Sequence, residues 1–198
     1  MCKMREMISM VVVLTVLTAV SGGLLAAIQS GTKDRIEAQI FKFQLAPAMD
    51  EIFGEVENEP AQEKFSVELD GVAYTFYPAK LKDGSTAVAL ETKGKGGYGG
   101  DIGLMVGINL GNDQIVAARV TTHAETPGLG SRAKDDPAFV SQFAEQGVMD
   151  TNLGLKADGG IIDAMSGATV TSRAITLAAI NAQAIYKQLK PEIEKQVK

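Results

Sequence analysis

The chain has 198 residues and a net charge of −5, and residues 29–198 contain 17 basic and 23 acidic side chains. Because this part is acidic and has no basic run, the composition argues against a nucleic-acid partner. The only cysteine is Cys2 and the only histidine is His123, which excludes an internal disulfide and argues against a cysteine-ligated iron–sulfur cluster or a zinc or haem site. Redox chemistry in this chain therefore needs an organic cofactor.

The N-terminal segment is apolar enough to cross a membrane. Residues 7–28 include no charged side chain, and 16 of these 22 residues are Ala, Val, Ile, Leu or Met. As a helix the segment is roughly 33 Å long, which spans a bilayer. Lys3 and Arg5 precede it, so the positive-inside rule predicts a cytoplasmic N-terminus and an extracytoplasmic, periplasmic-side domain on a single-pass inner-membrane anchor.

A cleaved signal peptide is the alternative for this segment. Residues 8–20 have the length of its apolar core, and the small residues 21–23 suit a nearby cleavage site. We prefer the retained anchor because apolar character resumes over residues 24–28 and the next charge is Lys33. Both interpretations export the remaining chain.

The rest of the chain predicts strands followed by helices. Residues 32–53 predict one or two stalk helices with a bend near Pro47, and a polar, acidic stretch follows. Alternating apolar residues then predict five strands, at residues 65–69, 73–77, 86–92, 102–110 and 114–122. Asp70-Gly71 and Gly111-Asn112 stand where tight hairpin turns are expected, which favours a mostly antiparallel sheet.

A short helix around residues 136–146 and a glycine-bearing loop are expected next. A last helix runs from about Ser172 to Lys187 or beyond, with one apolar face. We therefore predict an α+β fold with packed helices. The expected organisation is an N-terminal segment and transmembrane anchor, a helical stalk and linker, and an exported domain, at residues 1–28, 29–63 and 64–198.

Four hydroxyl residues gather where the last helix is expected to begin, in the sequence SGATVTS at residues 166–172. A helix N-terminus presents unpaired amide groups and the positive end of its dipole, which stabilise a phosphate. Gly167 and Ala168 leave the approach open. The alternative is ordinary helix capping, the commoner role of such residues, although one cap needs only one hydroxyl.

Two further segments combine glycine with chemically useful side chains. Residues 122–132, THAETPGLGSR, hold His123 and Glu125 ahead of a Pro-Gly turn, and a plain surface turn is the alternative. Residues 93–103, KGKGGYGGDIG, lie between predicted strands and permit close backbone approach to a ligand, but they match neither a P-loop nor a Rossmann fingerprint, and a flexible hairpin loop is the more common explanation.

Together these motifs resemble a known family. Residues 163–169, DAMSGAT, match the flavinylation pattern Asp-x-x-Ser/Thr-Gly-Ala-Thr of extracytoplasmic FMN-binding domains, and HAETPGLG and GYGG match its other signatures in order. The resemblance covers the whole chain, including the anchor. The family is shared by the G subunit of the Rnf ion-translocating ferredoxin:NAD⁺ oxidoreductase and the C subunit of the sodium-pumping NADH:quinone oxidoreductase. The length of this chain is more similar to that of the Rnf G subunit.

The resemblance implies a covalent cofactor. A separate flavin transferase would attach FMN, taken from FAD, to Thr169 through a phosphoester bond. Ser166, Thr171 and Ser172 would cap the helix or bind the phosphate oxygens, and Asp163 would aid transferase recognition or brace the loop. The pattern SGAT itself includes Gly167 and Ala168. The remaining pocket residues implied by similarity are Tyr98, His123, Glu125, Thr126, Gly128 and Leu129.

The implied function is electron relay between neighbouring membrane subunits, in an assembly that couples electron flow between ferredoxin and NAD⁺ to Na⁺ or H⁺ movement. No freely diffusing substrate, metal site or stand-alone catalysis is expected. One alternative is a covalent-FMN carrier of another membrane chain, such as a quinone-linked or extracellular reductase. Another is a membrane-tethered module that binds a phosphorylated ligand and has no redox role.

Overall fold

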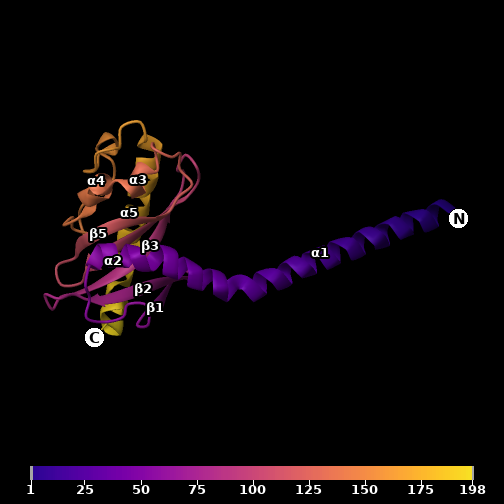
Figure 1. Ribbon diagram of the computed structural model, residues 1–198, viewed down its shortest axis with the longest axis horizontal. Coiled ribbons are helices and arrows are strands. Elements are labelled where there is room, and N and C mark those ends of the chain that lie inside the picture. The colour runs from indigo at the N-terminus through magenta and orange to yellow at the C-terminus, as the bar shows by residue number, and fades with distance from the viewer. Residues whose placement is uncertain (1, 198) are drawn as a thin grey trace. The chain divides into compact units, whose positions relative to one another are not determined.

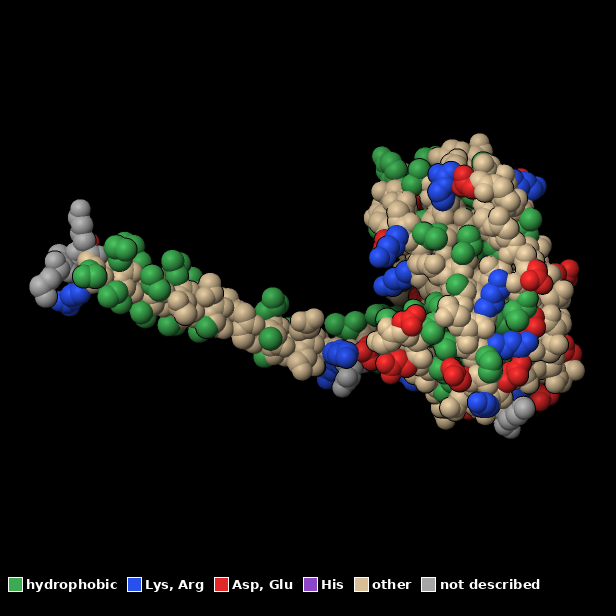
Figure 2. Space-filling view, turned by 180° about the vertical axis from the view of Figure 1, so that it is seen from behind, with side chains coloured by type: hydrophobic (Ala, Val, Ile, Leu, Met, Phe, Trp, Pro, Cys, Tyr) green, Lys and Arg blue, Asp and Glu red, His purple; other side chains and the backbone are tan. Residues whose placement is uncertain are grey.

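The computed structural model describes residues 2–197, without the side chains of Cys2, Lys3 and Asp34. Its contacts divide the chain into two compact units, one ending at Lys42 and one beginning at Phe43. The first unit is a single helix, α1 (Cys2–Ile40), in which Met4–Lys33 is long and apolar enough to cross a membrane. Its apolar side chains are exposed along its length (Figure 2), as expected for a helix that lies in lipid. This supports a single-pass membrane protein, and the orientation of the span stays a prediction.

The predicted irregularity near Pro47 takes the form of a π-helical turn. This turn, η1 (Phe41–Leu45), precedes α2 (Ala46–Phe53), and Pro47 lies in the first turn of α2, where its missing N–H leaves no intrahelical bond unmade. α2 buries Ala48, Met49 and Ile52 against β4 and β5. Residues 43–63, which the sequence assigns to the stalk and linker, thus belong to the second compact unit.

The second unit is built on an antiparallel sheet, as predicted. Five strands pair in chain order, and every neighbouring pair is antiparallel. At the first turn Asp70 and Gly71 both have positive φ, 52° and 78°, the backbone of a type I′ hairpin. At the last turn the residue with positive φ is Asp113, at 55°. The strands are β1 (Phe65–Leu69), β2 (Val72–Lys80), β3 (Thr86–Gly94), β4 (Ile102–Asn109) and β5 (Gln114–Thr122).

Helices cover both faces of the sheet. The long helix α5 (Thr169–Gln196) contacts β1, β3 and β4, and its alanine-rich face packs on apolar strand residues such as Leu90 and Leu104. α2 lies on the other face, where a Cβ atom at Gly107 would overlap the Ile52 side chain. This gives three layers, with the larger core between the sheet and α5 (Figure 1).

The connection from β5 to α5 differs from the prediction. Instead of one helix over residues 136–146, the structure has the short helices α3 (Arg132–Asp135) and α4 (Pro137–Val140), the 3₁₀ turn η2 (Ser141–Phe143) and, later, η3 (Lys156–Asp158). Asp136 separates α3 from α4, because its extended backbone caps α4, and its carboxylate accepts from the Ala138 N–H at 3.0 Å. The helical path then ends at Phe143, because Ala144 is extended, with ψ 142°. Figure 1 places α3 and α4 at the end of the domain where α5 begins, opposite the C-terminus.

Candidate functional site

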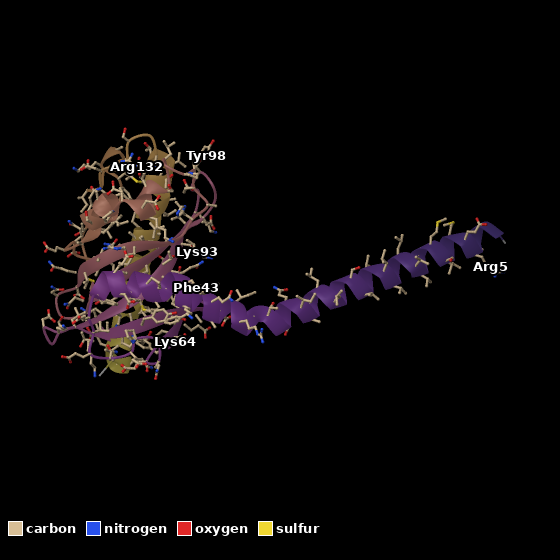
Figure 3. The ribbon with its side chains drawn as sticks, in the orientation of Figure 1. Arg5, Phe43, Lys64, Lys93, Tyr98 and Arg132 are labelled. Atoms are coloured by element: carbon tan, nitrogen blue, oxygen red, sulfur yellow. The ribbon has the colours of Figure 1, made fainter. Side chains whose placement is uncertain are left out.

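Three segments that are distant in sequence line one cavity at the N-terminal end of α5. The cavity measures about 570 Å³, within the range of small-ligand sites. Tyr98 contributes from the loop between β3 and β4, Glu125 and its neighbours follow β5, and residues 167–171 form the start of α5. Figure 3 shows Tyr98 and Arg132 at this end of the domain, with Lys64 toward the other end.

None of the four hydroxyls caps α5. The N-cap position is Ala168, and α5 has no side-chain cap. The fully buried Ser172 hydroxyl instead accepts from the Met165 N–H and donates to the Ala168 carbonyl, both at 2.9 Å, which fixes the preceding turn on the helix. The capping interpretation is therefore wrong, and the amide groups of the first turn have no side-chain oxygen as their cap.

The Thr169 hydroxyl differs from its neighbours. Thr171 donates to the Glu125 carboxylate, whereas the Thr169 hydroxyl makes no hydrogen bond within residues 2–197. Thr169 is exposed and lines the cavity. The preceding Gly167 has φ +76°, so the approach to the helix takes a backbone conformation that suits glycine. The Thr169 hydroxyl is thus presented at a helix start without a hydrogen-bond partner in the described residues 2–197.

Glu125 is a buried carboxylate at the centre of the site. It is only 6% exposed; Oε1 accepts from the Gly99 N–H at 2.8 Å, and Oε2 accepts from the Thr171 hydroxyl. Its own N–H donates to His123 Nδ1 at 3.2 Å. The turn that follows is closed by the Thr126 carbonyl, which accepts from Leu129 N and Ser131 N, both at 3.2 Å. The segment is therefore a tight turn as well as a wall of the cavity.

Most of the predicted site residues meet at this cavity, and some do not. Those that line it are Tyr98, Glu125, Thr126, Leu129, Gly167, Ala168, Thr169 and Thr171. Those that lie outside its lining are His123, Gly128, Asp163, Ser166 and Ser172. The Asp163 carboxylate pairs with Lys156 at 2.6 Å, and its backbone N–H and carbonyl both bond the Gln142 side chain. This arrangement fits the bracing role expected of Asp163. His123 is half-buried and supports the Glu125 backbone.

Two lining residues were not predicted. A Cβ atom at Gly130 would lie 2.7 Å from Glu125 Oε2, so only glycine leaves room for the carboxylate there. Gly130 stands inside the THAETPGLGSR motif, but the motif alone does not indicate that its glycine faces a carboxylate. Val170 projects from the first turn of α5 and is 46% exposed. Its outward position follows only once the helix is known to begin at Thr169.

The cavity lining is chemically mixed. It combines the threonines Thr169 and Thr171 at the start of α5 with the exposed apolar residues Tyr98, Leu129 and Val170. Nearby, the Arg173 guanidinium donates two hydrogen bonds to Asp158, at 2.9 and 3.1 Å, and these bonds together with its charge lower the pKa of that carboxyl. A ligand with an anionic group and a planar apolar part fits such a site.

Comparison with known proteins extends these observations. A family model described as an FMN-binding domain matches residues 97–184, which include all three cavity segments. The G subunit of the ion-translocating oxidoreductase complex of Escherichia coli O157:H7 is 34% identical over 190 residues, covering 91% of each chain. The G subunit of the same kind of complex in Erwinia tasmaniensis is 35% identical over 177 residues, covering 84% of this chain and 83% of that protein.

Solved structures of C subunits are also similar in part. The C subunit of the Na⁺-translocating NADH-quinone reductase from Parabacteroides distasonis is 21% identical and covers 58% of this chain and 61% of that one, with a TM-score of 0.49. NqrC of Shewanella oneidensis is 24% identical, covers 69% of this chain and 72% of that one, and has the same TM-score of 0.49.

Proposed function

Because the chain belongs to the family of G subunits of ion-translocating oxidoreductase complexes and carries an FMN-binding domain, we propose that it relays electrons through FMN attached covalently to Thr169. The coarser assignment, an electron-transfer flavoprotein subunit of such a complex, follows from family membership. The covalent bond, the residue that forms it and the identity of the electron partners are proposals.

The cavity fits FMN by its chemistry. The Thr169 hydroxyl is unengaged within residues 2–197 and stands beside the uncapped amide groups of α5, where a phosphodiester charge is stabilised. Tyr98, Leu129 and Val170 offer apolar surface to the ring system. When bound, FMN supplies one- and two-electron redox chemistry that no side chain of this domain provides.

The attachment step needs a flavin transferase and FAD. Thr169 Oγ forms the bond to the phosphorus nearest riboflavin, the diphosphate P–O bond breaks, AMP leaves and the hydroxyl proton passes to solvent. Ser172 and the Lys156–Asp163 pair hold the turn before α5, so that Thr169 is presented in a fixed position. The FMN is retained because it is covalently bound, which suits a carrier on the extracytoplasmic side.

We further propose that the complex is of the Rnf type and passes electrons between ferredoxin and NAD⁺. In it this protein has membrane partners on either side of the flavin and binds no freely diffusing substrate. If the protein instead served another membrane electron-transport chain, such as a quinone-linked reductase, it would use the same FMN site with different electron partners. A phosphate-ligand module without redox chemistry is less consistent with a cavity that the exposed apolar residues Tyr98, Leu129 and Val170 also line.

The observation that carries the proposal is the Thr169 hydroxyl, which has no hydrogen-bond partner in the part of the chain that the structure describes and lines a cavity to which all three motifs contribute. We expect the full chain, co-expressed with a flavin transferase, to gain the mass of one FMN less water on a peptide that contains Thr169. Thr169→Val should abolish this gain. Thr176→Val, the same change in the same helix away from the cavity, should retain it. A covalent flavin on Thr169→Val, or an unmodified wild-type chain, would overturn the assignment.

A further inference from the structure

The Glu125 carboxylate joins the three cavity segments directly. It follows β5, yet its two oxygens bond the Gly99 N–H, 26 residues earlier, and the Thr171 hydroxyl, 46 residues later. Glu125 and Thr171 line the cavity, and Glu125 is 6% exposed. Leaving a buried polar group without its hydrogen-bond partner is costly, so this contact is well placed to hold the segments together.

The glycines around this carboxylate explain part of the sequence motifs. A Cβ atom at Gly97 would lie 2.8 Å from Glu125 Oε1, and one at Gly130 would lie 2.7 Å from Oε2 and 2.8 Å from Thr171 Oγ1. At Gly99 a Cβ atom would overlap the Ala124 carbonyl oxygen. These glycines, in two of the three motifs, therefore make room for Glu125 and its backbone. Close approach of a ligand is not needed to account for them.

We propose that Glu125 is a positioning residue, a latch that fixes the loop of residues 95–101 on the start of α5. Tyr98 lies directly before Gly99, is 79% exposed and is the residue of this loop that lines the cavity. By holding the Gly99 amide, the latch keeps Tyr98 in the lining of the cavity that Thr169 also lines. The loop contact itself does not depend on the cofactor. Its consequence, that the latch restricts motion of the attached flavin, rests on the proposed function.

Substitutions in the latch differ in how many of its two hydrogen bonds they keep. A glutamine at position 125 keeps both bonds, because its carbonyl oxygen accepts from Gly99 N–H and its amide donates to the Thr171 hydroxyl, which can turn to accept. An alanine loses both. Thr171→Val keeps the carboxylate but removes the donor that orients it. Glu125→Gln should therefore behave much like the wild type, and Glu125→Ala should not.

The test is hydrogen exchange of the Gly99 amide, measured by NMR on the unflavinylated full chain in detergent micelles. We expect this amide to be protected in the wild type and to exchange at least about tenfold faster in Glu125→Ala. Thr171→Val should also raise the rate, and Glu125→Gln should stay within about threefold of the wild type. Thr176→Val removes a hydroxyl that bonds the Arg173 carbonyl in the same helix, and should leave the rate unchanged.

Several outcomes would overturn the latch. They are an unprotected Gly99 amide in the wild type, an unchanged rate in folded Glu125→Ala, or an equal increase in Thr176→Val. If Glu125→Ala does not fold, the exchange rates of the Gly99 amide in Thr171→Val and Thr176→Val are compared. Equal rates in these two variants would then overturn the latch.

A second measurement tests the consequence for the flavin. With FMN attached, Glu125→Ala should lower the fluorescence anisotropy of the flavin, and Glu125→Gln should preserve it. Unchanged anisotropy in Glu125→Ala would overturn the effect on the flavin while the loop contact stands. A wild-type chain that acquires no flavin would overturn the proposed function, and the exchange measurement on unmodified protein would be unaffected.

Discussion

The two ends of α5 use polar side chains for opposite purposes. In its C-terminal half Tyr186 is fully buried and donates to Asp113 at 2.7 Å, and the Lys190 ammonium lies 2.6 Å from both oxygens of that carboxylate. At its N-terminal end the Thr169 hydroxyl is exposed and has no partner within residues 2–197. One end pairs its polar groups internally, and the other leaves a hydroxyl for an external partner.

This difference separates stability from function along a single helix. Substitutions in the C-terminal half should change the free energy of unfolding and leave cofactor attachment intact. Substitution of Thr169 should do the reverse. Thr171 and Ser172 are exceptions to a simple division by position, because both are buried and internally bonded although they lie beside Thr169.

The largest effect is expected for Tyr186→Ala. This change empties the space of a fully buried ring and removes a hydrogen bond to Asp113, so the free energy of unfolding should fall by about 3–5 kcal/mol. Urea denaturation followed by circular dichroism measures this, and the folded fraction should still accept covalent FMN. A loss below about 1 kcal/mol would show that this half of α5 is not the stabilising end.

Ser172→Ala should destabilise the domain from within the hydroxyl-rich segment. It removes a buried hydroxyl and leaves the Met165 N–H without its partner, which costs about 1–3 kcal/mol. The same denaturation experiment, with Thr169→Val as the control at an exposed hydroxyl, checks the value. Equal stabilities of the two variants would contradict the division between structural and free hydroxyls.

Asp113→Asn should reduce the loss of folding stability at acid pH, because Asp113 is the carboxylate that pairs with the C-terminal half of α5. Burial opposes ionisation of Asp113, but hydrogen bonds from Lys190 and Tyr186 and the Lys190 charge hold the pKa of its carboxyl below its usual value. A lowered folded-state pKa stabilises the protein above the unfolded pKa of about 3.9, and this stabilisation is lost as the pH falls through the folded-state pKa. The wild type should therefore lose more stability than Asp113→Asn between about pH 5 and pH 2, which urea denaturation at each pH measures. Parallel pH profiles would contradict this.

The smallest effect on stability is expected for Thr169→Val. Its hydroxyl is exposed and unbonded within residues 2–197, so the free energy of unfolding should change by no more than about 0.5 kcal/mol. Thermal unfolding of the unflavinylated chain is the suitable measurement. A much larger loss would mean that the hydroxyl stabilises the helix start after all.

The sheet could be predicted because its signals are local. Alternating apolar residues and the Asp70-Gly71 turn placed all five strands within a few residues, and the periodicity of α5 predicted its buried face. The helix predicted at residues 136–146 begins where expected, with Asp136 as the cap of α4, but it was predicted too long because Ala144 is extended, with ψ 142°, and Glu145 has positive φ, 64°. The start of α5 was placed late by up to three residues because the hydroxyl-rich segment suggested caps that are absent.

The internal contacts of the site could not be predicted. Glu125 was expected in the flavin pocket, but its bonds to Gly99 and Thr171 join residues that are far apart in sequence. Packing of α2 was also missed, since Gly107 admits Ile52 only when the sheet and the helix are both in place. Such contacts depend on the assembled layers, and a local pattern does not indicate them.

The meander order of the sheet has a consequence for the sequence of events during folding. Each strand pairs with its neighbour along the chain, so β1 to β5 can assemble progressively as the polypeptide is synthesised. The larger core closes only when α5, which follows every strand, docks on the sheet. Thr169, the proposed attachment residue, is the first residue of that helix, so it reaches its final surroundings when α5 docks. A transferase that recognised the folded surroundings of Thr169 would therefore modify only chains in which α5 has docked.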